Sequence, residues 1–158
     1  MAASFERFWS ARDGWCFDVI DGPDGDDATL RPNQILVVSL QHSPLPMPRA
    51  RAVVDGGDLR ARDSGYHQGP AWGWLLGPFA IAHYRVYGDA ARAREFLTRL
   101  AEHLGDHGLG SIAEIFDGSA PFAPNGCIAQ AWSVAETLRA WHALDPDGSA
   151  PRRSSGVS

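Results

Sequence analysis

The chain has 158 residues, of which 44% are hydrophobic and 21% are charged, a composition typical of one folded globular domain rather than of a disordered chain. Its 14 basic and 19 acidic residues give a net charge of −5, which argues against a nucleic-acid partner, because such proteins need a basic surface to displace counterions from phosphates. No stretch approaches about 18 uninterrupted apolar residues, so the sequence predicts no membrane span.

Tryptophan is unusually frequent, with six residues in so short a chain. An indole ring offers a flat apolar face on which sugar rings stack, so this count favours a carbohydrate ligand. The two cysteines, Cys16 and Cys127, lie far apart and form no C-x-x-C motif, which argues against a disulfide framework or a zinc site and favours the cytoplasm. The first residues show no basic segment followed by an apolar run, so no secretion signal is expected.

Two histidines have a spacing that can suit a metal ion. His103 and His107 lie four residues apart, but no third ligand is evident near them. We therefore expect a solvated helix face at this position, and the sequence predicts neither a metal site nor a cofactor.

The first half of the chain predicts a succession of short elements. In chain order they are a helical turn or two at 4–11, a strand at 14–22, a loop at 23–32, a helix that begins near Pro32 and covers 33–44, a short helix at 48–55 and an irregular polar segment at 56–70.

The second half predicts longer helices. Residues 71–88 are apolar on nearly every face, and Pro78 is expected to kink this helix. Residues 89–105 are amphipathic, and 127–144 are again mostly apolar. The tail at 145–158 is rich in Pro, Gly and Ser and is predicted to be disordered.

The predicted helices alternate in character. The largely apolar ones, 33–44, 71–87 and 128–143, are separated by shorter or more charged ones, 48–55 and 89–105. Such alternation is the pattern of inner and outer helices in an α/α barrel of helical hairpins, in which the inner helices are buried on all sides. The sequence therefore predicts an all-α fold with short strand segments in its loops.

Polar motifs stand just before or at the start of the apolar helices. They are RPNQ at 31–34, YHQG at 66–69 and NGCIAQAW at 125–132. Helix N-termini carry unpaired N–H groups and the positive end of the helix dipole, so several of them facing one funnel predict a polar site.

One carboxylate is flanked by apolar residues in the motif GSIAEIFDG, residues 110–118. Glu114 in this position is either a strand carboxylate that points to solvent or an active-site base. Asp117, three residues later, either orients a reacting group or only starts the Asp-Gly turn.

Four motifs in order resemble the C-terminal part of microbial glycogen debranching enzymes, the amylo-α-1,6-glucosidase family. They are GDDATLRPNQI, YHQGPAWGWLLGPF, GSIAEIFDG and GCIAQAWSVAETLRAW, and the likeness runs along most of residues 14–142. The resemblance implies a glucoamylase-like, six-hairpin α/α barrel, of which residues 1–144 form roughly the C-terminal half. It also implies hydrolysis of α-1,6-glucosidic branch linkages in glycogen or limit dextrin.

The resemblance also implies roles for individual residues. Glu114 corresponds to the general base that activates water in an inverting reaction, with Asp117 behind it as an orienting or turn residue. The residues implied to bind the α-glucan are Asp27, Arg31, Asn33, Gln34, His67, Gln68, Trp72, Gln130 and Trp132. For His67 and Gln68, capping of the helix that follows is an equally good interpretation.

Three of the implied binding residues have a structural alternative. Arg31, Asn33 and Gln34 stand where they would cap a helix N-terminus, and Arg31 would form a salt bridge with Asp26 or Asp27. From the residues alone this alternative is the better interpretation.

The tryptophans near the predicted funnel also divide between two roles. Trp72 and Trp74 point in different directions on a helix, so one is expected to face the funnel and the other the core. Trp132 is a better funnel residue than Trp141, which lies nearly on the opposite side of its helix. Cys127 is expected to be a buried structural cysteine, with a reactive thiol as the alternative.

The chain departs from the family at three points. The general-acid Asp has no matching motif in these residues and belongs upstream, the segment between RAVVD and YHQG is shorter, and Pro70 and Ala71 replace an expected Thr-Val pair. We therefore expect the chain to be inactive alone and to need either the N-terminal half of the barrel or self-association to cover helices such as 71–87. The alternatives are a non-catalytic glucan-binding or interaction module and an unstable truncated product.

Overall fold

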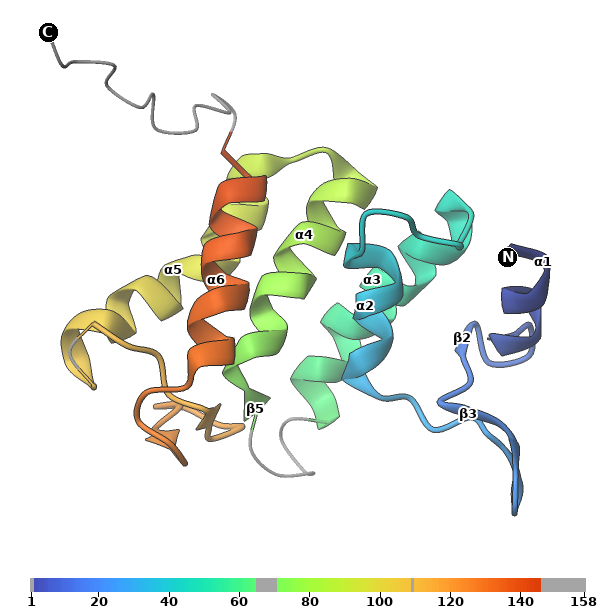
Figure 1. The fold of residues 1–158 in the computed structure, drawn as a ribbon, viewed down its shortest axis with the longest axis horizontal. Helices are drawn as coiled ribbons and strands as arrows, with labels where there is room; N and C mark the ends of the chain where they lie inside the picture. The colour runs from blue at the N-terminus through green and yellow to red at the C-terminus, as the bar shows by residue number, and fades with distance from the viewer. Residues whose placement is uncertain (1, 65–70, 109, 146–158) are drawn as a thin grey trace, which may run out of the picture.

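The computed structural model describes residues 2–64, 71–108 and 110–145, with the side chains of 57–64 left out. The fold is mostly α-helical with a few short strands, as the sequence predicts (Figure 1). His67 and Gln68 lie outside the described residues, as does nearly all of the predicted tail. Within the described ranges, no helix is both long and apolar enough to cross a membrane.

The N-terminal region consists of two small hairpins after a short helical start. Its elements are α1 (Ala2–Phe5), a 3-10 turn (Glu6–Phe8), β1 (Trp9–Ser10), β2 (Trp15–Cys16), β3 (Val19–Gly22) and β4 (Gly25–Asp27). β1 pairs with β2 and β3 pairs with β4, both antiparallel. The predicted strand at 14–22 is therefore divided in two, and the predicted loop at 23–32 contains a strand, because Gly25 adopts the left-handed turn conformation that closes a hairpin.

The next two helices differ in length from their predictions. A 3-10 turn (Pro32–Gln34) leads into α2 (Ile35–Ser39), which ends five residues before the predicted boundary at 44. α3 (Met47–Ser64) continues well past the predicted end at 55. A helical Gly costs only about 1 kcal/mol relative to Ala. The pair at 56–57 therefore does not end α3, and the prediction of an irregular segment from residue 56 is wrong as far as Ser64.

The central helix is α4 (Leu76–Tyr87), which follows β5 (Ala71–Trp72) and a 3-10 turn (Gly73–Leu75). It packs against α2, α3, α5 and α6. Pro78 lies in the first turn of α4, where a helix tolerates proline because the first N–H groups lack intrahelical partners. The prediction of a helix from residue 71 that Pro78 kinks is therefore wrong, because the helix begins only at Leu76.

The last two helices complete the packing around α4. α5 (Ala90–Asp106) is amphipathic as predicted and is capped by Asp89, whose carboxylate accepts a 2.9 Å hydrogen bond from the Arg92 N–H. α6 (Ala131–Ala143) begins four residues later than predicted, because residues 127–130 form a non-helical lead-in that bends at 128–129.

Helix directions agree with the predicted alternation of two kinds of helix. In Figure 1, α2, α4 and α6 run in one direction with their N-termini at the lower end, and α3 and α5 run in the other direction. One apolar core joins α2, α3 and α4 around Val38, Val53 and Ala82, and a second joins α4, α5 and α6 around Leu97 and Ala140. Membership of these helices in a barrel stays a prediction.

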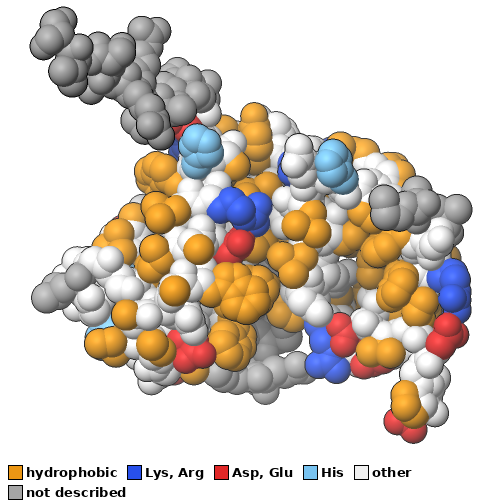
Figure 2. All heavy atoms as spheres, viewed as in Figure 1, with side chains coloured by type: hydrophobic (Ala, Val, Ile, Leu, Met, Phe, Trp, Pro, Cys, Tyr) orange, Lys and Arg blue, Asp and Glu red, His pale blue; other side chains and the backbone are white. Residues whose placement is uncertain are grey.

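Burial of the apolar helices is unequal. α4 buries most of its length, as expected of an inner helix, but α6 exposes several large apolar side chains (Figure 2). Trp132 is 56% exposed, Leu138 64% and Trp141 49%. The prediction that α6 is buried on all sides is wrong within this chain. Large apolar side chains are also exposed within 71–87, at Trp72, Tyr84 and Tyr87.

Candidate active site

A three-stranded sheet lies at the N-terminal ends of α4 and α6. β5 pairs with β6 (Ile115–Phe116), and β6 pairs with β7 (Pro124–Asn125), both antiparallel. Figure 1 shows β5 directly below α4. The motif GSIAEIFDG therefore supplies the central strand of a sheet that the segments entering both helices also join.

Backbone hydrogen bonds fix the segment around Glu114 on both sides. The Gly73 N–H donates to the Glu114 carbonyl at 3.1 Å, and the Glu114 N–H donates to the Cys127 carbonyl at 2.9 Å. Further along, the Gln130 N–H donates to the Ile112 carbonyl at 2.9 Å. Because buried backbone groups need such partners, the segment is held between the approach to α4 and the approach to α6.

The Glu114 carboxylate is half-buried and turned toward the start of the α6 lead-in. Its Oε2 accepts a 3.1 Å hydrogen bond from the Cys127 N–H. Its Oε1 has no hydrogen-bond or ion-pair partner in the part of the chain that the structure describes. Glu114 therefore differs from a strand carboxylate that points freely to solvent, because one of its oxygens is fixed by a hydrogen bond. The other oxygen can accept a hydrogen bond from a ligand or water.

Gly126 makes this arrangement possible. A Cβ atom there would stand 2.7 Å from Glu114 Oε2, and the residue has a φ of +71°. Both the close approach and the left-handed backbone favour glycine. Cys127 itself is exposed, so the prediction of a buried structural cysteine is wrong.

Aromatic side chains gather beside this sheet. Trp74 and Trp132 stack with ring centroids 4.4 Å apart and an interplanar angle of 16°. Trp74 is half-buried, whereas Trp72 and Trp132 are 48% and 56% exposed. The structure thus joins two tryptophans from different segments, and it leaves Trp72 and Trp132 exposed. Their place in a funnel stays a prediction.

Asp117 and Gln130 have structural roles at the edges of the sheet. Asp117 Oδ1 accepts a 2.7 Å hydrogen bond from Asn125 Nδ2, and the Asp117 N–H donates to the Ala123 carbonyl at 2.9 Å. These bonds close the turn between β6 and β7. Gln130 is the residue before α6, and its side chain makes no capping hydrogen bond there.

His103 makes a contact with Ala113 that the sequence did not reveal. It is 8% exposed, and its Nε2 accepts a 3.2 Å hydrogen bond from the Ala113 N–H, so the prediction of a solvated face is wrong for this residue. Burial lowers the pKa of His103, nearby His107 lowers it further, and Asp106 partly opposes the shift. In the described ranges, no three His, Cys, Asp or Glu side chains lie together as a metal site would require.

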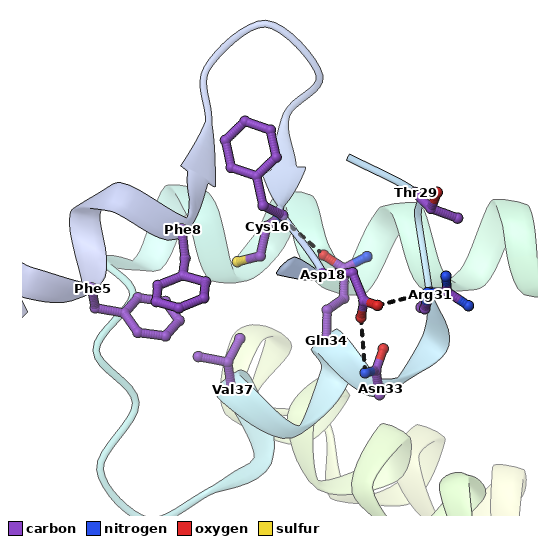
Figure 3. Close-up of a pocket in the computed structure, with 10 residues that line it drawn as sticks. Phe5, Phe8, Cys16, Asp18, Thr29, Arg31, Asn33, Gln34 and Val37 are labelled. Atoms are coloured by element: carbon purple, nitrogen blue, oxygen red, sulfur yellow. Dashed lines mark hydrogen bonds and ion pairs between the residues drawn. The ribbon is translucent and has the colours of Figure 1, made fainter. Parts of the chain in front are cut away.

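The other predicted binding residues form a separate polar cluster near the N-terminal hairpins. We call Asp18, Arg31, Asn33 and Gln34 the Arg31 cluster. Arg31 Nε lies 2.7 Å from Asp18 Oδ2, Asn33 Nδ2 donates to Asp18 Oδ1 at 3.2 Å, and Gln34 Oε1 accepts from the Cys16 N–H at 3.3 Å. Figure 3 shows these side chains turned toward one another at a pocket of about 180 Å³.

Asp27 and Arg31 form the salt bridge that the sequence offered as an alternative to ligand binding. Their closest oxygen and nitrogen are 3.4 Å apart, whereas Asp26 accepts a hydrogen bond from the Asp21 N–H. Hydrogen bonds from Thr29 hold the pKa of Asp27 below its ordinary value, with a smaller contribution from Arg31. No side chain caps the Pro32–Gln34 turn, so the capping prediction is wrong.

Comparison with known families identifies the region that carries Glu114. A family model described as amylo-alpha-1,6-glucosidase matches residues 54–139, more than half of the chain. This range includes the sheet, Glu114 and the tryptophan pair, and it excludes the Arg31 cluster. No solved structure matches the chain significantly. The chain therefore belongs to the amylo-alpha-1,6-glucosidase family, as its motifs predict.

Proposed function

We propose that the chain provides the general-base portion of an α-1,6-glucosidase that acts on the branch linkages of glycogen or limit dextrin. The observation that carries this proposal is the Glu114 carboxylate, held at one oxygen by the Cys127 N–H inside the range that matches the family. A general base needs a fixed position and an accessible oxygen, and Glu114 has both.

The reaction assigned to Glu114 is the activation of water. Glu114 takes a proton from a water molecule, the water oxygen forms a bond to the anomeric carbon, and the bond to the glycosidic oxygen breaks while that oxygen receives a proton from an acid. An inverting glycosidase places its two carboxyl groups roughly 6.5–9.5 Å apart, with the water between the base and the sugar. The acid is expected from a segment upstream of the matched motifs.

The tryptophans are the proposed sugar platform. Trp132 rests on Trp74, which fixes the indole plane, and Trp132 remains 56% exposed. An aromatic ring held in this way can stack on a glucose ring without losing side-chain freedom on binding. Gln130 stands next to this platform and, with His67 and Gln68, is proposed to contact sugar hydroxyls.

The exposed face of α6 is proposed to be covered by other protein. Two of its large apolar side chains, Leu138 and Trp141, are 64% and 49% exposed and do not belong to the sugar platform. The N-terminal half of a barrel or a second copy of this chain would cover such a face. The alternative function is a glucan-binding module without catalysis, which the same exposed tryptophans favour if no acid joins Glu114.

α-Glucosyl fluoride separates these functions, because fluoride leaves the sugar without protonation by an acid. The chain alone should release fluoride and β-glucose from this substrate, whereas it should not hydrolyse limit dextrin without the acid. Glu114→Gln should lower fluoride release by about 10²-fold or more. Glu102→Gln, an exposed carboxylate on α5, should not change it.

Two outcomes would contradict the proposal. Equal fluoride release by the Glu114→Gln variant and the unmodified chain would remove Glu114 from the reaction. Binding of limit dextrin without any fluoride release would favour the glucan-binding module.

A further inference from the structure

We propose that His103, in its neutral form, is a positioning residue for Glu114: it holds the segment that carries this carboxylate by accepting a hydrogen bond from Ala113 and packing against Phe116. The inference rests on Glu114 being the functional carboxylate. It adds a residue from α5 to a site that otherwise consists of the sheet and the approaches to α4 and α6.

The imidazole contacts the residues on both sides of Glu114. Its Nε2 lies 3.2 Å from the Ala113 nitrogen, one residue before Glu114. Its ring meets the Phe116 ring, two residues after Glu114, edge-on with centroids 5.1 Å apart and an interplanar angle of 77°. Two contacts that flank one residue restrict both its translation and its rotation.

Gly73 approaches the same two neighbours closely. A Cβ at Gly73 would stand 2.9 Å from the Phe116 ring and 3.2 Å from the Ala113 carbonyl oxygen. The strand segment is therefore clamped by two contacts, one from His103 on α5 and one from Gly73 at the entry to α4. Ile112 and Ala113 are almost fully buried, at 2% and 1% exposure, so the clamp is dry.

Only the neutral imidazole can make the Ala113 bond. When Nε2 accepts a hydrogen bond, the ring proton resides on Nδ1; protonation places a hydrogen on both nitrogens and sets two donors against each other. Burial keeps the ring neutral. The charged groups around it are His107 and Asp106 on α5, and on the clamped segment Glu114 and Asp117, whose carboxylates are engaged by Cys127 and Asn125.

Two substitutions separate the hydrogen bond from the packing. In His103→Gln the side-chain oxygen can take the place of Nε2 and does not titrate, whereas His103→Leu fills the space without an acceptor. Amide exchange and chemical shifts measured by NMR between pH 4.5 and 8 report Ala113 and Cys127 directly. This NMR measurement needs no turnover. The positioning role of His103 can therefore be refuted even if Glu114 proves to be catalytic, and the catalytic role of Glu114 can be refuted even if His103 positions it.

The unmodified chain should show one shared transition. As His103 takes up its proton, the protection of the Ala113 amide against hydrogen exchange should fall about tenfold. The chemical shift of the Cys127 amide, which donates to Glu114, should change at the same pH. His103→Gln should abolish this transition, and His103→Leu should show low Ala113 protection at every pH. An unchanged Ala113 amide in the folded His103→Leu variant, or a Cys127 amide that ignores His103 protonation, would overturn the inference.

Discussion

The residues around Glu114 and those of the Arg31 cluster are both polar, but they are organised in opposite ways. Glu114 is held by backbone groups, and one carboxylate oxygen has no hydrogen-bond or ion-pair partner among the residues that the structure describes. In the Arg31 cluster the charge of Arg31 is already paired, because Arg31 forms salt bridges with Asp18 and with Asp27 outside the cluster. A charge that is already matched must lose its partner before it binds a ligand, so the first region is suited to chemistry and the second to joining loops.

The largest effect is expected where α4 and α6 cross, because this contact fixes both approaches to Glu114. A Cβ at Gly77 would stand 2.4 Å from the backbone oxygen of Glu136. Gly77→Ala should lower the free energy of unfolding by about 3 kcal/mol, the upper end of overpacking costs. Chemical denaturation measures this change.

Gly105→Ala is the matched control for that experiment. Gly105 lies in α5 with no atom within 4 Å of an added Cβ. The substitution should raise the free energy of unfolding by about 1 kcal/mol, because alanine is the better helix former. Equal stability of the two variants would show that α4 and α6 are not packed so closely that a Cβ at Gly77 meets the Glu136 backbone.

The second largest effect is expected at Gly126, which lies against the Glu114 carboxylate. Gly126→Ala should displace the carboxylate, since its Cβ would stand 2.7 Å from Oε2, and should lower fluoride release from α-glucosyl fluoride by about 10²-fold. Gly88→Ala has nearly the same φ, +72°, with no atom within 4 Å, and should cost only about 1 kcal/mol of stability. If both variants kept full fluoride release, the position of Glu114 would not matter for the reaction.

A smaller effect is expected in the Arg31 cluster. Asp18→Asn removes the closer of the two carboxylates bound to Arg31. Because the Arg31 side chain is half exposed, the free energy of unfolding should fall by about 1 kcal/mol or less, and fluoride release should not change. A loss of fluoride release as large as that of Glu114→Gln would place the Arg31 cluster in the active site and remove the contrast between the two regions.

The smallest effect is a change in how stability depends on pH. The pKa of His103 is lower in the folded chain than in the unfolded one, so the unfolded chain binds the proton first. His103 therefore makes stability fall as the pH drops below about 6.5, until the folded chain is also protonated. His103→Gln should flatten this part of the curve in thermal unfolding; a steeper slope would contradict the shift.

The spacing of apolar residues within a segment correctly predicted a helix whose burial follows from that spacing alone. α5 follows from the spacing of Ala93, Leu97 and Leu100, all of which are buried. The extension of α3 was missed, because glycine and charged residues lower helix propensity without forbidding a helix. The β3–β4 hairpin was also missed, although Asp and Gly between two extended segments are a hairpin signal.

The contacts around Glu114 were not predictable from the sequence, and the roles of the candidate site residues stay predictions. Glu114 and Trp132 stand out by type and by the resemblance. The bond from Cys127 to Glu114 joins residues 13 apart, and the stacking of Trp74 on Trp132 joins two helices. Nothing in local spacing encodes such pairs, because they depend on how the helices pack. The burial of His103 has the same origin, since its partner Ala113 lies beyond the end of α5.

The most direct test of the account asks where a glucan binds. A branched limit-dextrin oligosaccharide is titrated into isotopically labelled chain, and the indole N–H of Trp132, the amide of Cys127 and the indole N–H of Trp15 are followed by NMR. Trp15 reports the N-terminal hairpins, where its Nε1 donates to the Ala28 carbonyl at 2.8 Å. If the glucan binds beside Glu114, saturable shifts should occur at Trp132 and Cys127 and none at Trp15. Shifts at Trp15 with none at Cys127 would contradict binding beside Glu114.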